Sequence, residues 1–351
     1  MSLARAGLRD AGRRAKSLFA LSAALALFVL AGLSPLAAEP PVASVQRIEV
    51  RAVPIPSFDP GNPERRRFGA LAFLGGIELS SPDKNFGGLS SLKMQADGAN
   101  FVMLSDVARW FRGRILYRDG RPVGLADVET APALDMDGRP LAARGWYDTE
   151  SLAESDGFFY VGIERANQIV RFNYARDGLL ARGQPIEAPA EIKSLPYNRG
   201  LECLAAPART MPLAGALIAV SERGLDPEGN LKSFIVGGQM PGLFAVKRRD
   251  DFDVSDCTVT PDADLLLLER RFNWRQGLAM RIRRIPLSQI RPGALIDGAV
   301  LIEADLGYQI DNMEGIGVHR AQDGRLVVTL VSDDNFFRLQ RTILLQFAIV
   351  E

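Results

Sequence analysis

The chain has 351 residues, 47% of them hydrophobic, and its 42 Lys and Arg residues balance 42 Asp and Glu residues. This size allows a large buried core, and the even charge excludes the basic surface that a nucleic-acid partner requires. One histidine and two cysteines cannot form the usual zinc shell, while 33 glycines and 21 prolines between short apolar runs favour a turn-rich β fold.

Residues 1–38 have the order of a secretory signal peptide. A basic segment is followed by an apolar run at residues 18–33 and by Pro35, Ala37 and Ala38. We predict cleavage near Ala38, a periplasmic or secreted protein, and no stable membrane insertion afterwards. A retained anchor is the alternative, but the run is short for a span of ~20 residues. The pair Arg13-Arg14 leaves twin-arginine export open.

Five segments after the signal repeat one order of features: a Gly-Leu or acidic start, a turn, an apolar strand and an acid. The anchors of these repeats are Leu89, Glu150, Glu202, Asp256 and Glu314. They lie 61, 52, 54 and 58 residues apart, a period that fits a four-stranded blade. The sequence therefore predicts an all-β fold, a β-propeller formed by residues 39–351 as one domain.

The period also predicts the number of blades. A repeat of ~55 residues divides the mature chain into about six units, of which five are visible. A sixth blade is expected to combine strands at residues 45–53 and 70–79 with the C-terminal strand, a closure that removes exposed sheet edges. Third strands are expected at residues 169–174, 243–248, 280–285 and 342–347. A pair of β-sandwiches is the alternative, and the regular spacing argues against it.

Acidic residues recur at two positions of the repeat. Because the first and second strands pair antiparallel, the start of the first lies beside the end of the second. The first strands begin with Glu150, Glu202 and Glu314. The second strands end with Asp106, Glu164, Glu222, Glu269 and Asp333. We expect all of them at one mouth of the central channel.

So many carboxylates at one mouth predict a cation site. Neighbouring like charges repel and raise each other's pKa, and a bound cation relieves the repulsion. Oxygen ligands suit Ca²⁺, with the second-strand acids as metal ligands and the first-strand glutamates as catalytic groups. Four arginines beside these acids are expected to bind an anionic ester: Arg165, Arg199, Arg223 and Arg270. The alternative is that the Glu-Arg steps form salt bridges between blades and nothing else.

Other chemistries find little support in the sequence. A Ser-His-Asp triad would need His319, which is expected at the far end of its strand, away from the acids. The sequence contains no G-x-S-x-G, Walker or G-x-G-x-x-G motif. Cys203 and Cys257 occupy matching places in adjacent repeats. We expect two buried free thiols, because such places on neighbouring blades are expected to exceed the ~7 Å limit of a disulfide; export would permit a bridge.

The ordered set of segments resembles the phytase-like family of exported bacterial proteins, known for "esterase-like activity of phytase". The matching segments are residues 86–90, 105–106, 148–153, 198–202, 267–272, 311–316, 332–336 and 340–342. The resemblance implies a β-propeller that hydrolyses phosphate or other esters, and it supplies no catalytic list. The chain departs from the family pattern at Val107-Ala108, where Arg-Gly is usual, and at Ser151, where Gly is favoured.

Three functions remain open from the sequence. The first is a Ca²⁺-assisted hydrolase of phosphate esters, acting as a monomer on a small anionic substrate. The second is a Ca²⁺-dependent carboxylic esterase or lactonase with the same ligands. The third is a non-catalytic propeller that binds a periplasmic ligand or protein.

Overall fold

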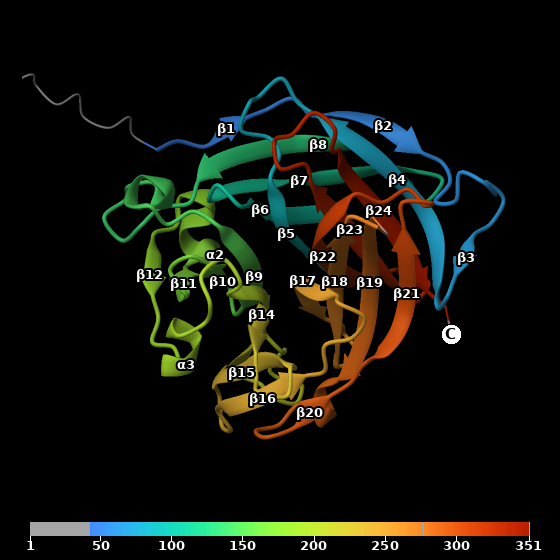
Figure 1. Cartoon of the computed structure of the whole chain (residues 1–351). Coiled ribbons are helices and arrows are strands. Elements are labelled where there is room, and N and C mark those ends of the chain that lie inside the picture. Colours follow the sequence, from blue (N-terminus) through green and yellow to red (C-terminus); the bar gives the residue numbers. More distant parts are fainter. Residues whose placement is uncertain (1–42, 276, 351) are drawn as a thin grey trace, which may run out of the picture. The chain divides into compact units, whose positions relative to one another are not determined.

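Five sheets, antiparallel except for one short parallel pair, make up the structure, a computed structural model that describes residues 43–275 and 277–350 (Figure 1). The predicted signal peptide lies outside the described residues. The innermost strands are β5 (Leu89–Met94), β9 (Thr149–Ser155), β13 (Leu201–Ala205), β17 (Asp253–Val259) and β22 (Asn312–Arg320). Each contacts the next, and β22 contacts β5, so the inner strands close a ring. This arrangement confirms the predicted β-propeller.

The strands of each blade follow one another outward from this ring. Blade one adds β6 (Asn100–Ser105), β7 (Arg109–Arg118), β8 (Arg121–Pro132) and β1 (Gln46–Arg47). Blade two adds β10 (Phe158–Ile163), β11 (Gln168–Phe172) and β12 (Gly183–Pro185). Blade three adds β14 (Ala216–Leu225), β15 (Leu231–Gly237), β16 (Gly242–Val246) and β20 (Leu295–Ile296). Blade four adds β18 (Asp264–Asn273), β19 (Gly277–Pro286) and β21 (Ala299–Asp305).

The fifth blade explains why the structure has five sheets where the repeat length predicted about six. It adds β23 (Leu326–Asp333), β24 (Thr342–Ile349), β4 (Leu71–Ser80) and β2 (Arg51–Ile55), and β3 (Arg67–Phe68) pairs with β4. The N-terminal strands therefore complete the last repeat instead of forming a blade of their own. The pairing of β4 with β24 is the predicted N- and C-terminal closure.

Short helices occupy the connections. They are α2 (Tyr174–Asp177), α3 (Ala190–Lys193) and the 3-10 turns η2 (Leu141–Arg144), η3 (Gly178–Leu180) and η4 (Leu287–Gln289). Within the described part of the chain, none of the helices has the length and apolarity that a bilayer crossing requires.

Apolar side chains fill the gaps between neighbouring blades. In one gap, Leu266 and Leu268 of blade four pack with Val328 and Leu330 of blade five. In another, Ile77 of β4 packs with residues of blade one, so the closing strand also seals the ring. Alternating residues of each strand thus face one of two such cores, as stacked sheets require.

Serine hydroxyls join the inner strands where no backbone ladder does. Ser91 Oγ donates to the carbonyl of Glu150 at 3.1 Å, and Ser151 Oγ donates to that of Leu201 at 3.0 Å. Ser255 Oγ donates to the carbonyl of Met313 at 2.9 Å. Small polar side chains at these places let the strands approach closely around the channel.

This close approach corrects the expectation of two free thiols. Cys203 and Cys257 form a disulfide between β13 and β17, with their Cα atoms 5.1 Å apart. Five blades bring the inner strands nearer to one another than the sequence argument assumed, so matching positions lie within bonding range.

Removing the disulfide is expected to lower the free energy of unfolding by about 4 kcal/mol in the chain-entropy description, because it joins residues 54 apart. Urea unfolding of the double variant Cys203→Ser, Cys257→Ser measures the loss. A reductant should destabilise the wild type and leave the double variant unchanged. Two titratable thiols in the denatured, unreduced wild type would contradict the bridge.

Candidate functional site

Every inner strand contains a β-bulge at the same position of the repeat. The bulged residue has no partner on the neighbouring strand. In blade two, Thr149 pairs with Ile163 and Ser151 with Gly162, so Glu150 has no partner across the ladder. The same skip occurs in the other four blades. The five bulged residues are Ser90, Glu150, Glu202, Ser255 and Glu314. The predicted first-strand glutamates are therefore the three acidic members of one ring.

A second ring consists of the residues opposite the inner-strand starts. The backbone N–H groups of Asp106, Glu164 and Glu222 donate to the carbonyls of Gly88, Asp148 and Gly200 at 2.7–2.8 Å. Asp333 pairs with Asn312 in blade five. In blade four the equivalent residue is Arg270, which pairs with Asp253. The second ring thus holds four acids and one arginine.

Glu269 is not brought to this group. Its register is one residue away from the other acids, so it faces the opposite side of β18. Its side chain is fully buried and forms a two-point ion pair with Arg283, with separations of 2.9 and 2.5 Å. The sequence assigned Glu269 to the metal ligands as the acid that ends its second strand, but the structure gives it an internal partner.

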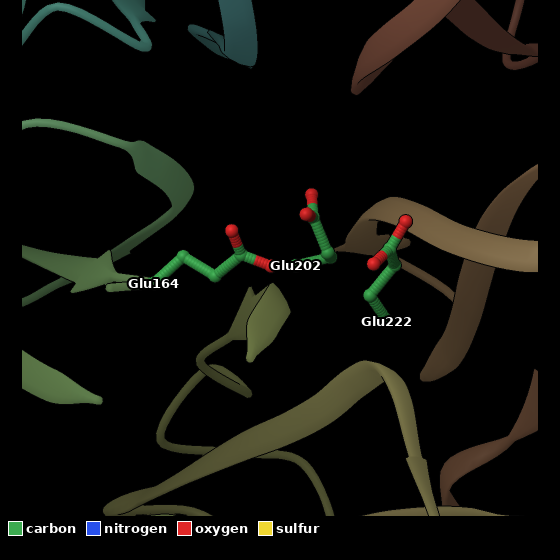
Figure 2. A group of neighbouring side chains, drawn as sticks. All are labelled: Glu164, Glu202 and Glu222. Carbon is green, nitrogen blue, oxygen red and sulfur yellow. The ribbon is translucent and has the colours of Figure 1, made fainter. Parts of the chain in front are cut away.

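We call the remaining set the acidic mouth. It comprises Asp106, Glu150, Glu164, Glu202, Glu222, Glu314 and Asp333, together with Arg270. Within it, Glu164, Glu202 and Glu222 each offer a carboxylate oxygen within 4.8 Å of the others. Figure 2 shows these three side chains next to one another at the meeting of blades two and three. Glu164 is fixed by the N–H of Gly200, which donates to Oε1 at 2.9 Å.

Burial and crowding hold protons on this group. Burial raises the pKa of Glu164 to about 7, with the charge of Glu222 adding to the effect. Burial, followed by the charge of Glu150, also raises the pKa of Glu202 well above its ordinary value. A cation between these carboxylates would remove the cost of ionising them.

The other half of the acidic mouth has the same character. Burial and the nearby Glu314 raise the pKa of Asp106 to about 7 and that of Asp333 to about 9. Burial, then Glu314, raises the pKa of Glu150 well above its usual range. One Asp106 oxygen is shielded from solvent and has no hydrogen-bond partner among the described residues.

Arg270 lies between the two halves. Its guanidinium is 3.3 Å from Glu314 and 3.6 Å from Glu222, and it donates to Asn312 Oδ1 at 3.2 Å. Asn312 in turn donates to Glu314 at 2.8 Å. Burial works against the charge of Arg270, yet the surrounding glutamates outweigh burial and raise its pKa above the usual value. One guanidinium faces seven carboxyl groups and cannot neutralise them.

The other predicted arginines lie outside this centre. Arg165 pairs with Asp148 and stacks on Tyr147. Arg223 pairs with Asp253, with Nε–Oδ1 at 2.8 Å, beside Arg248. Arg199 is half-buried and close enough to Arg223 to help burial lower the pKa of that residue. The alternative of salt bridges between blades therefore describes Arg223, whose partner Asp253 lies in blade four, whereas Arg165 pairs within blade two. Arg270 belongs to the acidic mouth, where it also pairs with acids of blades three and five.

His319 lies at the far end of β22, buried against Gly98 and away from the acidic mouth. Sequence reasoning missed the bulged Ser90 and Ser255, the bridging Asn312 and the equivalence of Arg270 with the acids. Aligning the short steps Glu150-Ser151-Leu152, Glu202-Cys203-Leu204 and Ser90-Ser91-Leu92 would have revealed Ser90.

A family model described as "Phytase-like: Esterase-like activity of phytase" matches residues 84–336, more than two thirds of the chain. The chain belongs to this phytase-like family. The match spans all five inner strands and every residue of the acidic mouth. A comparison with curated proteins found no match.

Three solved structures similar to this phytase-like chain share little sequence identity with it. The aldose sugar dehydrogenase of Streptomyces coelicolor, in its PQQ-bound form, shares 13% identity at a TM-score of 0.38, over 88% of this chain and 99% of that chain. The WD40 propeller domain of Doa1 shares 8% at 0.35, over 75% and 93%. The dihydro-heme d1 dehydrogenase NirN shares 17% at 0.32 over 92% of this chain, which spans only 63% of NirN. Likenesses this weak carry no argument about activity.

Proposed function

We propose that this chain is an exported hydrolase of small anionic phosphate esters that works with Ca²⁺ at the acidic mouth. The observation that carries the proposal is the trio Glu164, Glu202 and Glu222, whose carboxylate oxygens lie within 4.8 Å of one another. Oxygens that bind one Ca²⁺ at about 2.3–2.6 Å lie at such mutual distances. The family description, which names an esterase-like activity, supports ester hydrolysis.

Each residue group of the acidic mouth has a separate role in this proposal. Glu164, Glu202 and Glu222 would hold the ion, which when bound polarises a phosphoryl oxygen and acidifies a water. Arg270, 31% of whose side chain is exposed, would bind a phosphoryl oxygen and offset the charge that develops there. Glu150 and Glu314, on the same ring of bulges, would orient the attacking water and take its proton.

Export and the monomeric state belong to the same proposal. The disulfide between Cys203 and Cys257 supports an oxidising compartment, because such bridges persist outside the cytosol. The signal peptide predicted at residues 1–38 agrees with periplasmic or secreted delivery.

The direct test is hydrolysis of a phosphomonoester by the purified mature chain, with calcium and after calcium removal. Activity should depend on calcium, and Glu202→Gln should raise the calcium concentration needed for activity, because it removes one of the three carboxylates that hold the ion. Glu154→Gln is the matched control, because Glu154 is an exposed carboxylate at the other end of β9 from Glu150. Turnover that is unchanged both by calcium removal and by Glu202→Gln would contradict the proposal.

A carboxylic esterase or lactonase is the second candidate, favoured by the word esterase in the family description. A panel that scores phosphate release against carboxylic ester cleavage separates the two. A non-catalytic propeller would instead show ligand binding in calorimetry while every ester stays intact.

A further inference from the structure

An aromatic side chain lies at the edge of the acidic mouth without entering a core. Phe336, in the segment between β23 and β24, leaves 46% of its surface exposed. Its ring packs on the backbone of Gly87 and Gly88, where an added Cβ would come within 3.1 and 2.7 Å of it. The same added Cβ on Gly88 would overlap Asp106 Oδ1. The ring edge and this carboxylate are therefore neighbours.

The backbone holds the ring in this place at a conformational cost. Asn335 and Phe336 have φ of 47° and 50°, the left-handed region that bulky residues avoid. The turn is fixed by Asp333, which accepts from the N–H of Asn335 at 2.6 Å, and by Asp334, which accepts from that of Phe336 at 3.1 Å. Asp334 also accepts from the N–H of Gly88 at 3.0 Å, which ties the turn to blade one. Strain of this kind persists where surrounding contacts impose it and concentrates at functional sites.

The charges around the ring limit what it can contact. Asp106 and Asp334 meet the ring at Gly88 and Gly87, and Asp333 holds the turn that carries it; the carboxyl groups nearest the ring are thus acids of the acidic mouth and its rim. A leaving group that carries further phosphates would find no cationic partner among these residues, whereas a neutral apolar group would bury the exposed ring face.

We propose that Phe336 determines specificity for esters whose leaving group is neutral and apolar, an aromatic alcohol above all. This inference rests on the proposed function. The phosphoryl group would lie by Arg270 and the glutamate trio, and the leaving group would extend toward Asp106 and pack against the ring. Phe336 acts by packing and takes no part in proton transfer.

The test compares two esters of primary alcohols, benzyl phosphate and glycerol 1-phosphate, in the calcium-loaded enzyme. Phe336→Ala should lower kcat/KM for benzyl phosphate by about tenfold and leave the glycerol ester within about twofold. Phe336→Leu should retain part of the preference. Phe337→Ala is the matched control, since Phe337 is the adjacent exposed phenylalanine at 56% and should change neither value.

Calorimetry with benzylphosphonate and methylphosphonate tests the same contact without turnover. Tighter binding of the benzyl compound by the wild type, lost in Phe336→Ala, supports the inference. If no ester is cleaved, that result refutes only the proposed hydrolysis. An equal fall for both substrates in a variant of unchanged Tm, or equal binding of both phosphonates by the wild type, overturns the inference. Absence of both turnover and binding overturns the inference and the proposed function together.

Discussion

Without metal, the protein is expected to lose several kcal/mol of unfolding free energy between pH 5 and pH 8, and calcium is expected to restore most of it at pH 8. The folded-state pKa values of Asp106 and Glu164 are raised to about 7 and that of Asp333 to about 9. In this range the folded protein binds protons that the unfolded chain has already released. The contribution of these groups to folding stability is therefore complete below pH ~4 and is lost as the pH rises through 7 and then through 9.

Groups outside the acidic mouth also contribute to this slope. Burial raises the pKa of Asp256 to about 7 and raises that of Glu269, so both add to the loss of stability with rising pH. Burial lowers the pKa of His319, which favours folding as pH rises through 6.5, but this is one proton against several. Asp97, Asp156 and Asp323 have lowered pKa values, so their contribution is complete above pH ~4 and constant from 5 to 8.

Urea unfolding of metal-free protein at pH 5, 6, 7 and 8, repeated with calcium, measures both effects. Glu202→Gln should flatten the pH dependence, because it removes one of the crowded carboxyls, and should weaken the response to calcium. Constant or rising stability between pH 5 and 8 would contradict the crowded-carboxylate interpretation. A missing calcium effect at pH 8 would contradict the ion site.

Breaking the internal pair of Glu269 and Arg283 should have an effect of similar size. Both side chains are fully buried, and Arg283 also donates to the carbonyl of Lys247 at 3.0 Å. Arg283→Met leaves a buried carboxylate without its partner, a change that costs about 3–5 kcal/mol. The double variant Glu269→Leu, Arg283→Met should recover much of that loss, because neither charge remains.

The matched control is Arg325→Ala, which breaks the exposed pair with Asp323, whose side chains are about half exposed. That change should leave the free energy of unfolding nearly unchanged, because solvent screens an exposed pair. Equal losses for Arg283→Met and Arg325→Ala would show that burial does not govern these pairs. Glu269→Gln should reduce stability and, in the fraction that folds, leave calcium binding intact, which distinguishes Glu269 from the residues of the acidic mouth.

The sequence alone determined the parts of this protein that depend on local signals. Apolar runs of strand length and a repeat near 55 residues predicted the propeller, and the recurring Glu150, Glu202 and Glu314 were correctly placed at the starts of inner strands. The segments that resemble the phytase-like family led to the family that the comparison found. Such features can be recognised in the sequence because each repeat is formed largely by residues that are neighbours in the chain.

Tertiary structure decided what depends on long-range pairing and register. Whether β2 and β4 form a blade or complete one is set by the contact of β4 with β24, more than 260 residues apart, so the sequence period overcounted the blades. The pairing register of β18 places Arg270 at the acidic mouth and Glu269 on the opposite side of the strand, because successive side chains alternate across a strand. The ring of five inner strands also brought Cys203 and Cys257 together, and it placed one arginine among seven carboxyl groups whose crowding no single repeat could reveal.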